Sequence, residues 1–173
     1  MSKSLIVQKY GGTSVGTLER IEHVADCIVK TRKTGVDIVV VVSAMAGETD
    51  KLLKMARSLS KNPARREVDM LLSSGERISA ALLALALQSR GIPAFSMSGR
   101  QIGLQTDSTH TRARITNIEA RRARKMLNEN HVIVVAGFQG INEEGDVTTL
   151  GRGGSDTSAV ALAVALGARQ CEI

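Results

Sequence analysis

Aromatic side chains are scarce in this 173-residue sequence, at 2% of all residues. Many proteins that bind single-stranded nucleic acid stack bases on aromatic rings, and Tyr10, Phe95 and Phe138 alone offer no such platform. The sequence also shows no helix-turn-helix or zinc-finger pattern for reading duplex DNA. We therefore expect no nucleic-acid partner, although the net charge is +6.

Cysteine is rare as well. Cys27 and Cys171 lie far apart and match no metal-binding or redox spacing, which predicts core thiols in a reducing compartment. His23, His110 and His131 share no spacing with each other or with the cysteines. Ordinary core or surface roles are expected for them, and no residue is assigned as a metal ligand.

Long hydrophobic runs are missing too. The most apolar run, Ala80 to Leu87, is flanked by Arg77 and Arg90 and is too short to span a bilayer. Met1 to Ser4 leads straight into a short apolar run, so we expect no signal peptide. The sequence predicts a cytoplasmic protein without a membrane partner.

Positive charge is concentrated in one region, which predicts either a solvated helix face or a surface for an acidic partner. Its basic residues are Arg112, Arg114, Arg121, Arg122, Arg124 and Lys125, relieved there only by Glu119.

The remaining composition, 43% hydrophobic and 23% charged, is typical of one globular domain. Short apolar runs alternate with segments of helical period. We expect strands over 5–10, 36–42, 93–97 and 132–136, and helices over 18–35, 49–60, 68–88, 118–128 and 160–167. The third helix is expected to be interrupted at 73–76, the segment 98–111 to be irregular, and 142–146 to form a hairpin tip.

This alternation predicts βαβ crossovers and a mainly parallel sheet with helices on both faces. Ligands of such sheets bind beyond the carboxyl ends of the strands. Lys9 to Gly12, Ser43 to Thr49 and Gly137 to Gly140 each follow a predicted strand, so we expect them at one edge.

The segment Thr148 to Ala159 holds three glycines within four positions and opens an apolar, Ala-rich helix. Unsatisfied amides and the helix dipole make such a loop a favourable binding site for an anion. Arg152 adds a planar fork for a carboxylate or phosphate, and Asp156 falls in the first helical turn. A tight loop before a capped helix, without a ligand, is the alternative.

Lys9 ends an apolar strand, where its charge needs an anionic ligand or a carboxylate partner. A purely structural ion pair is possible there. Gly11, Gly12 and Thr13 supply amides and a hydroxyl beside it, although this motif is neither the Walker loop nor the dinucleotide fingerprint. Asp156 could orient Lys9 or hold a metal.

Glu76 lies beside Gly75 within the longest helical stretch and could receive an ammonium group. An exposed helical glutamate is the alternative. Together with Arg152 it would match the two charged groups of an amino acid.

Five segments resemble the motif set of the aspartokinases, which belong to the amino-acid kinase family, and the resemblance runs from Lys3 to Ile173. The segments are Val7 to Val15, Val42 to Met45, Ser74 to Arg77, Val135 to Gly140 and Thr148 to Ala159.

This resemblance implies a three-layer αβα sandwich with a mainly parallel sheet, as in carbamate kinase. It also implies transfer of the γ-phosphate of ATP, with Mg²⁺, to the side-chain carboxylate of L-aspartate. The product would be 4-phospho-L-aspartate, on the route to lysine, threonine, methionine and diaminopimelate.

The resemblance also assigns roles. Lys9 and Asp156 would be catalytic, with Lys9 neutralising the transferring phosphoryl group and Asp156 aligning it. The residues implied for phosphate or ATP are Lys9, Tyr10, Gly11, Gly12 and Ser43, and those implied for aspartate are Thr49, Glu76, Phe138, Arg152, Gly153, Gly154 and Ser155.

In that family the chain continues past Cys171-Glu172-Ile173 into a segment that forms much of the nucleotide pocket, and most members carry ACT regulatory domains. We therefore expect residues 1–173 to be the substrate-binding, N-terminal part of a catalytic domain, truncated and inactive alone, with an unfinished sheet edge that favours self-association. Two alternatives stay open, another small-molecule kinase of this fold and a non-catalytic binding or assembly module.

Overall fold

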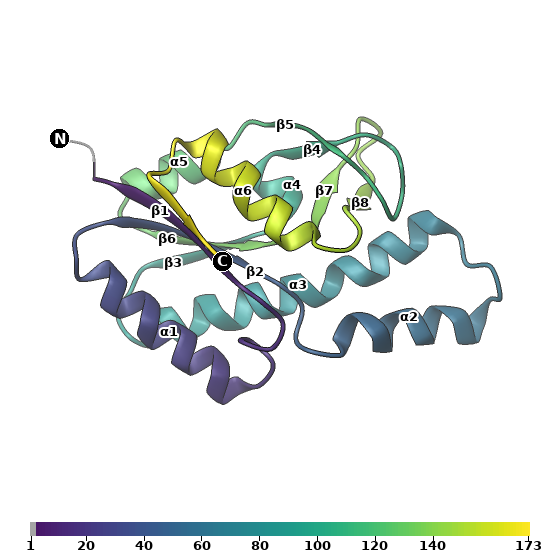
Figure 1. Ribbon diagram of the computed structural model, residues 1–173, viewed down its shortest axis with the longest axis horizontal. Helices are drawn as coiled ribbons and strands as arrows, with labels where there is room; N and C mark the ends of the chain where they lie inside the picture. Colours follow the sequence, from purple (N-terminus) through teal and green to yellow (C-terminus); the bar gives the residue numbers. More distant parts are fainter. Residues whose placement is uncertain (1–2) are drawn as a thin grey trace.

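A computed structural model describes residues 3–173 of the chain. Helices and strands alternate along most of it (Figure 1). The elements are β1 (Leu5–Tyr10), α1 (Leu18–Arg32), β2 (Asp37–Val42), α2 (Glu48–Leu59), α3 (Arg65–Gln88), β3 (Ala94–Met97), α4 (Gly99–Ile102), β4 (Leu104–Thr106), β5 (Ile115–Ile118), α5 (Arg121–Asn128), β6 (Val132–Ala136), β7 (Gln139–Ile141), β8 (Val147–Thr149), α6 (Gly154–Leu166) and β9 (Gln170–Glu172).

The main sheet has five strands in the order β3-β6-β2-β1-β9, and every neighbouring pair is parallel. All five residues of β6 and the last five of β2 are buried, as expected for β-branched runs covered on both faces. The predicted strands at 5–10, 36–42, 93–97 and 132–136 are thus confirmed to within a residue. Strand β9 forms the edge of this sheet and pairs with β1.

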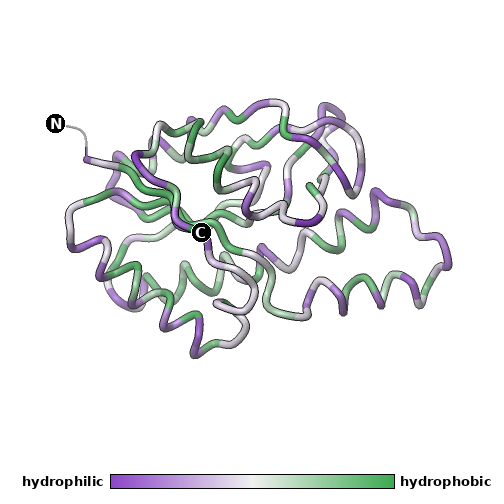
Figure 2. The backbone as a smooth tube through the Cα atoms, viewed as in Figure 1, coloured by the Kyte–Doolittle hydropathy of each residue, from purple (hydrophilic) through white to green (hydrophobic). Residues whose placement is uncertain are grey.

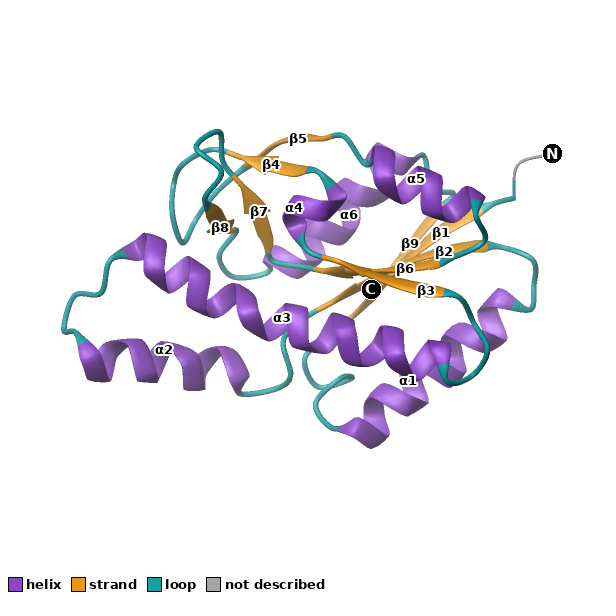
Figure 3. Ribbon diagram, turned by 180° about the vertical axis from the view of Figure 1, so that it is seen from behind, coloured by secondary structure: helices purple, strands orange, loops and turns teal. Residues whose placement is uncertain are grey.

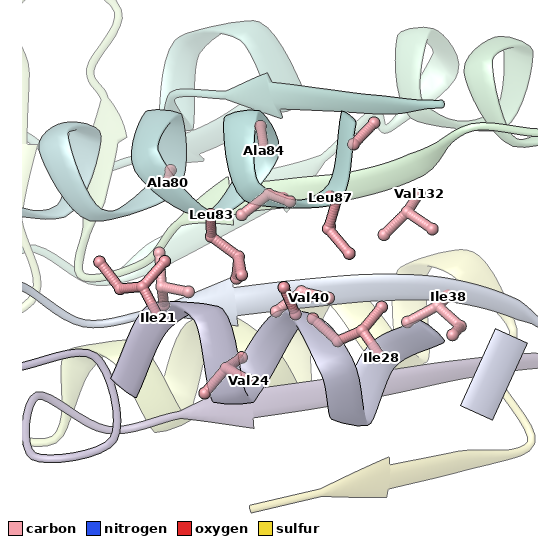
Figure 4. Packing of buried hydrophobic residues seen from close by; sticks show 14 of the residues in the cluster. Ile21, Val24, Ile28, Ile38, Val40, Ala80, Leu83, Ala84, Leu87 and Val132 are labelled. Carbon is pink, nitrogen blue, oxygen red and sulfur yellow. The ribbon is translucent and has the colours of Figure 1, made fainter. Parts of the chain in front are cut away.

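Helices cover both faces of this sheet and form the three-layer αβα sandwich that the sequence predicts (Figure 3). On one face α1 and α3 pack against alternate strand residues, with Ile28 and Leu83 facing Val40 (Figure 4). On the other face α5 and α6 pack against residues such as Val41 and Val135. The hydropathy-coloured tube shows the apolar strands between the two helical layers (Figure 2).

A second, smaller sheet of order β5-β4-β7-β8 lies beside the first and was not predicted. The expectation of an irregular segment over 98–111 is wrong for 99–106, where α4 and β4 form, and is confirmed for 107–111. The basic helix begins at Arg121 because Ile118 belongs to β5. The predicted hairpin tip at 142–146 is confirmed, since it joins the antiparallel strands β7 and β8.

Helix α3 runs without a break through 24 residues, so the interruption expected at Ser73 to Glu76 is wrong. The hydroxyls of Ser73 and Ser74 donate to the carbonyls of Met70 and Leu71 within the helix, which satisfies them without disturbing it. By length and composition α3 could cross a membrane, but half of its apolar window is buried inside the fold, as in a core helix.

The basic residues of α5 are partly used inside the fold. Arg124 donates to the carbonyls of Ala165 and Leu166 at the end of α6, where a cation is favoured by the helix dipole. Arg122 lies 5.1 Å over the ring of Phe95. Neither cysteine is a fully buried core thiol, since Cys27 and Cys171 are both partly exposed and unpaired.

Candidate active site at the carboxyl edge of the main sheet

One cavity, of about 650 Å³, opens at the edge where β1 and β2 end. Its volume is within the range of small-molecule sites. Besides these strand ends, the first turn of α2, the middle of α3, the end of β8 and the glycine loop before α6 contribute to it. It is lined by Lys9, Ser43, Ala44, Thr49, Asp50, Leu53, Leu72, Glu76, Thr111, Phe138, Thr149, Gly151, Arg152, Gly153, Gly154, Ser155 and Asp156.

Lys9 and Asp156 form an ion pair in this cavity, with Nζ 2.6 Å from Oδ1. Strand β1 supplies the lysine, and the first turn of α6 supplies the aspartate. The lysine side chain is 13% exposed and the aspartate side chain 47%, so the pair is open to a ligand from one side. Gly11 lies next to it, because a Cβ there would be 3.6 Å from Lys9 Nζ.

The loop after β1 packs tightly on the loop after β2. A Cβ on Gly12 would lie 2.7 Å from the Ala44 carbonyl oxygen, so only glycine allows this approach. The Ala46 amide donates to the Gly12 carbonyl at 3.1 Å. Ser43, at the start of the second loop, lines the cavity beside Lys9.

Three of the implied phosphate-binding residues do not line the cavity: Tyr10, Gly11 and Gly12. The Tyr10 ring packs instead against the core under α1, and this burial raises the pKa of Tyr10 to about 12. Gly11 and Gly12 shape the adjoining turn.

The glycine loop adopts left-handed backbone at Gly151 (φ 80°) and Gly153 (φ 73°), which explains two of its glycines. Gly154 is close-packed, since a Cβ there would lie 2.9 Å from both the Phe138 ring and Leu150. Helix α6 begins at Gly154 without a side-chain cap. The Gly154 amide donates to the Gly151 carbonyl at 3.0 Å, so the amides of Ser155 and Asp156 are the ones suited to an anion.

Arg152, between these glycines, is exposed and makes no ion pair within residues 3–173. Phe138 has an unusual φ of 69° and donates its backbone N–H to the Ser158 hydroxyl at 3.1 Å, which fixes the ring against the cavity.

Glu76 faces the cavity from α3 and is 3% exposed. Its Oε1 accepts the Ala44 amide at 3.2 Å, whereas its buried Oε2 has no hydrogen-bond partner. Burial raises the pKa of Glu76 from 4.5 to about 7. A buried carboxylate with a free oxygen is suited to a cationic group of a ligand.

Sequence reasoning missed several residues of the site. Asp50, Thr111 and Thr149 line the cavity, and Ala44 contributes an amide rather than a side chain. Asp69 is fully buried beneath the cavity and bonds both threonines. A carboxylate on the apolar face of a predicted helix was the signal that could have identified it.

Comparison with known proteins identifies the family of the chain. The model of the Amino acid kinase family matches residues 4–173. The chain is 56% identical to the aspartate kinase Ask_LysC of Stutzerimonas stutzeri, covering 98% of this chain and 41% of that protein. It therefore spans about two fifths of the length of this curated relative.

Solved structures give the same result. The crystal structure of aspartate kinase from Synechocystis superposes with a TM-score of 0.84 at 52% identity, over 97% of this chain and 27% of that one. Aspartokinase III of E. coli, solved with aspartate and ADP, superposes with a TM-score of 0.81 at 27% identity, over 96% and 48%. By sequence and fold, the chain is a member of the amino acid kinase family.

Proposed function

We propose that the protein is an aspartate kinase, which transfers the γ-phosphate of ATP to the side-chain carboxylate of L-aspartate. The names of its relatives and the aspartate and ADP in the E. coli structure support this proposal. Because the chain spans only 41% of its curated relative, activity is assigned to the protein that contains this region.

The observation that carries the proposal is the convergence of three charged groups on one cavity. Arg152, Glu76 and the Lys9–Asp156 pair all line it, although Lys9, Glu76 and Arg152 are far apart in the sequence. Arg152 suits the α-carboxylate of an amino acid, and Glu76 suits its ammonium group. The substrate side chain would then point towards Lys9.

The residues of this chain would position and stabilise charge rather than form covalent intermediates, as is usual in phosphoryl transfer. A side-chain oxygen of aspartate attacks the γ-phosphorus, and the bond from that phosphorus to the β-γ bridging oxygen breaks to release ADP. Lys9 would neutralise the charge on the transferred group, and Asp156 would hold the Lys9 ammonium in place. Ser43, which lines the cavity, would contact phosphate oxygens, and Gly11 and Gly12 would shape the adjoining turn.

The nucleotide is expected to bind as its magnesium complex. Magnesium is usually held by one or two carboxylates together with the phosphates themselves. Residues 3–173 contain no group of three His, Cys, Asp or Glu side chains that could hold a metal unaided. Asp156 is the carboxylate nearest to Lys9 and the candidate ligand, and the ion would supply charge neutralisation on the phosphates.

We assign residues 1–173 to the substrate-binding portion of the catalytic domain. Thr49, Phe138, Gly153, Gly154 and Ser155 would complete the aspartate pocket, since all of them line the cavity. Association through the open edge of β9 stays a prediction.

The first test is Arg152→Ala in the full-length protein. Loss of the charge-assisted hydrogen bonds to the α-carboxylate should weaken aspartate binding by on the order of 2–4 kcal/mol and leave ATP binding nearly unchanged. Hydroxylamine trapping of the acyl phosphate, at varied aspartate and varied ATP, measures both effects. Arg121→Ala is the matched control, because that arginine side chain is 87% exposed and lies on α5.

The same assay tests the substrate. Wild-type protein should phosphorylate L-aspartate and neither N-acetylglutamate nor UMP. Turnover of one of those instead, or loss of ATP rather than aspartate affinity in Arg152→Ala, would refute the assignment.

A further inference from the structure

The candidate site contains a buried carboxylate that the proposed reaction does not use. Asp69, near the start of α3, is fully buried. Its two oxygens accept the Thr149 hydroxyl at 2.5 Å and the Thr111 amide at 3.1 Å, and Oδ2 lies 2.7 Å from His110 Nδ1. Within residues 3–173 it has no lysine or arginine partner.

Both hydrogen-bonded threonines belong to the wall that carries Arg152. Thr149 ends β8, just ahead of the glycine loop, and its carbonyl accepts the Ala113 amide at 2.9 Å. Thr111 packs beside the same loop, because a Cβ on Gly151 would lie 3.4 Å from its carbonyl oxygen. Asp69 therefore ties two segments of this wall to α3.

Helix α3 also supplies the opposite wall. Glu76 follows Asp69 by seven residues, which is about two turns and roughly 10 Å along the same face of the helix. A continuous helix is stiff over this length. Asp69 and its two threonine contacts therefore link Glu76 to the Arg152 loop, alongside the bond from Gln139 Nε2 to the Ser73 carbonyl of α3 at 2.8 Å.

We propose that Asp69 is a positioning residue that fixes the distance between the carboxylate clamp at Arg152 and the ammonium acceptor at Glu76. It touches no substrate and acts through Thr111 and Thr149. This inference rests on the proposed function for its ligand. Its physical reason is that a substrate with two charged ends is bound well only when both partners are held at the matching separation.

Aspartate binding in a double-mutant cycle tests this role. Asp69→Asn keeps the shape of the side chain but removes the charge that strengthens its hydrogen bonds, and an NH2 group in place of Oδ2 cannot accept the Thr111 amide and can pair only with an unprotonated His110 Nδ1. We expect aspartate affinity of the full-length protein to fall at least tenfold and nucleotide affinity to change less than twofold. In the Arg152→Ala background the same substitution should lower aspartate affinity less than twofold, because the arginine that Asp69 positions is absent.

Two further variants complete the test. Glu67→Gln removes an exposed carboxylate from the same helix, where it pairs with Arg66, and should change nothing. Thr149→Val removes a single contact to Asp69, and should lower aspartate affinity three- to tenfold even where Asp69→Asn fails to fold. Equal losses in both Arg152 backgrounds, or equal losses of aspartate and nucleotide, would show that Asp69 merely stabilises the fold.

Hydrogen exchange provides a readout without any ligand. Amides of residues 149–154 should exchange faster in Asp69→Asn than in wild type, whereas those of β6 should be unchanged. If wild-type protein fails to bind aspartate, the proposed function is wrong, yet this exchange pattern still decides whether Asp69 holds the loop. Unchanged exchange at 149–154 would overturn the inference.

Discussion

The two sheets of this protein are held together in different ways. The main sheet is apolar on both faces, with strands such as β2 and β6 buried between helical layers. The small sheet is short and is built around buried polar groups, including Thr106, Gln139 and Thr148. The first tolerates apolar side chains of suitable volume, whereas the second depends on specific hydrogen-bond partners.

The small sheet shows this dependence at Gly140 in β7. A Cβ there would lie 2.6 Å from the side chains of Leu104 and Thr106 in β4. Gly140 also pairs with Thr148 of β8. Its missing side chain lets the Thr106 and Thr148 hydroxyls meet at 2.6 Å across the middle strand.

The largest effect on stability is expected in the main core. Leu83→Ala in α3 leaves a cavity against β2 and α1, and should lower the free energy of unfolding by about 2–5 kcal/mol. Leu85→Ala, two residues on and 60% exposed, is the matched control and should cost little. Denaturant titration of both variants gives the comparison, and similar losses would mean that the core is not where stability resides.

A pH-dependent effect of similar size is expected at Glu76. Its folded pKa, about 7, is above its ordinary 4.5, so the folded state keeps a proton that the unfolded state has lost. The free energy of unfolding should therefore fall by roughly 3 kcal/mol as the pH rises from below 4.5 to above 7. Glu76→Gln should lack this component of the pH dependence.

The two Glu76 profiles are compared by denaturant titration at pH 4.5, 6 and 8 without ligand. Because the ammonium group of aspartate favours the ionised carboxylate, aspartate should bind more tightly as the pH approaches 8. Parallel stability profiles for wild type and Glu76→Gln would contradict the assigned protonation.

The smallest effect tests the polar sheet. Thr148→Val leaves the Thr106 hydroxyl without a partner in a buried site, and should cost about 1–3 kcal/mol. The double variant Thr106→Val, Thr148→Val replaces both partners and should be closer to wild type than the single one. If the double variant is less stable than the single one, the hydrogen bond between the two hydroxyls itself stabilises the fold, beyond the cost of leaving one hydroxyl unpaired.

The difference between the sheets also explains what the sequence could predict. Strand β2 was predictable because the unbroken run of β-branched residues from Ile38 to Val42 leaves little choice of structure. Strands β4 and β8 have three residues each, too few for a period. Their pairing depends on contacts such as Thr106 with Thr148, which lie 42 positions apart.

The site divides in the same way. Lys9, Glu76, Arg152 and Asp156 were predictable because each is a charged residue at a strand end, in an apolar helix or in a glycine loop. Asp69 was missed because its three hydrogen-bond partners lie at least 41 positions away in the sequence and meet it only in the folded chain.

Helix α3 connects the main core to the candidate site, so a tilt at one end would be transmitted to the other. Its C-terminal half, around Leu87, is clamped in the main core, while its N-terminal half extends with α2 beyond the sheet (Figure 1). Asp69 lies 18 residues from Leu87, or about 27 Å along the axis. A tilt of about 5° at the clamped end would move the far end by roughly 2 Å, and a misplacement of about 1 Å can slow catalysis a hundredfold. Substitutions that weaken the packing around Leu87 should therefore lower turnover at a smaller loss of stability than is needed to unfold the protein.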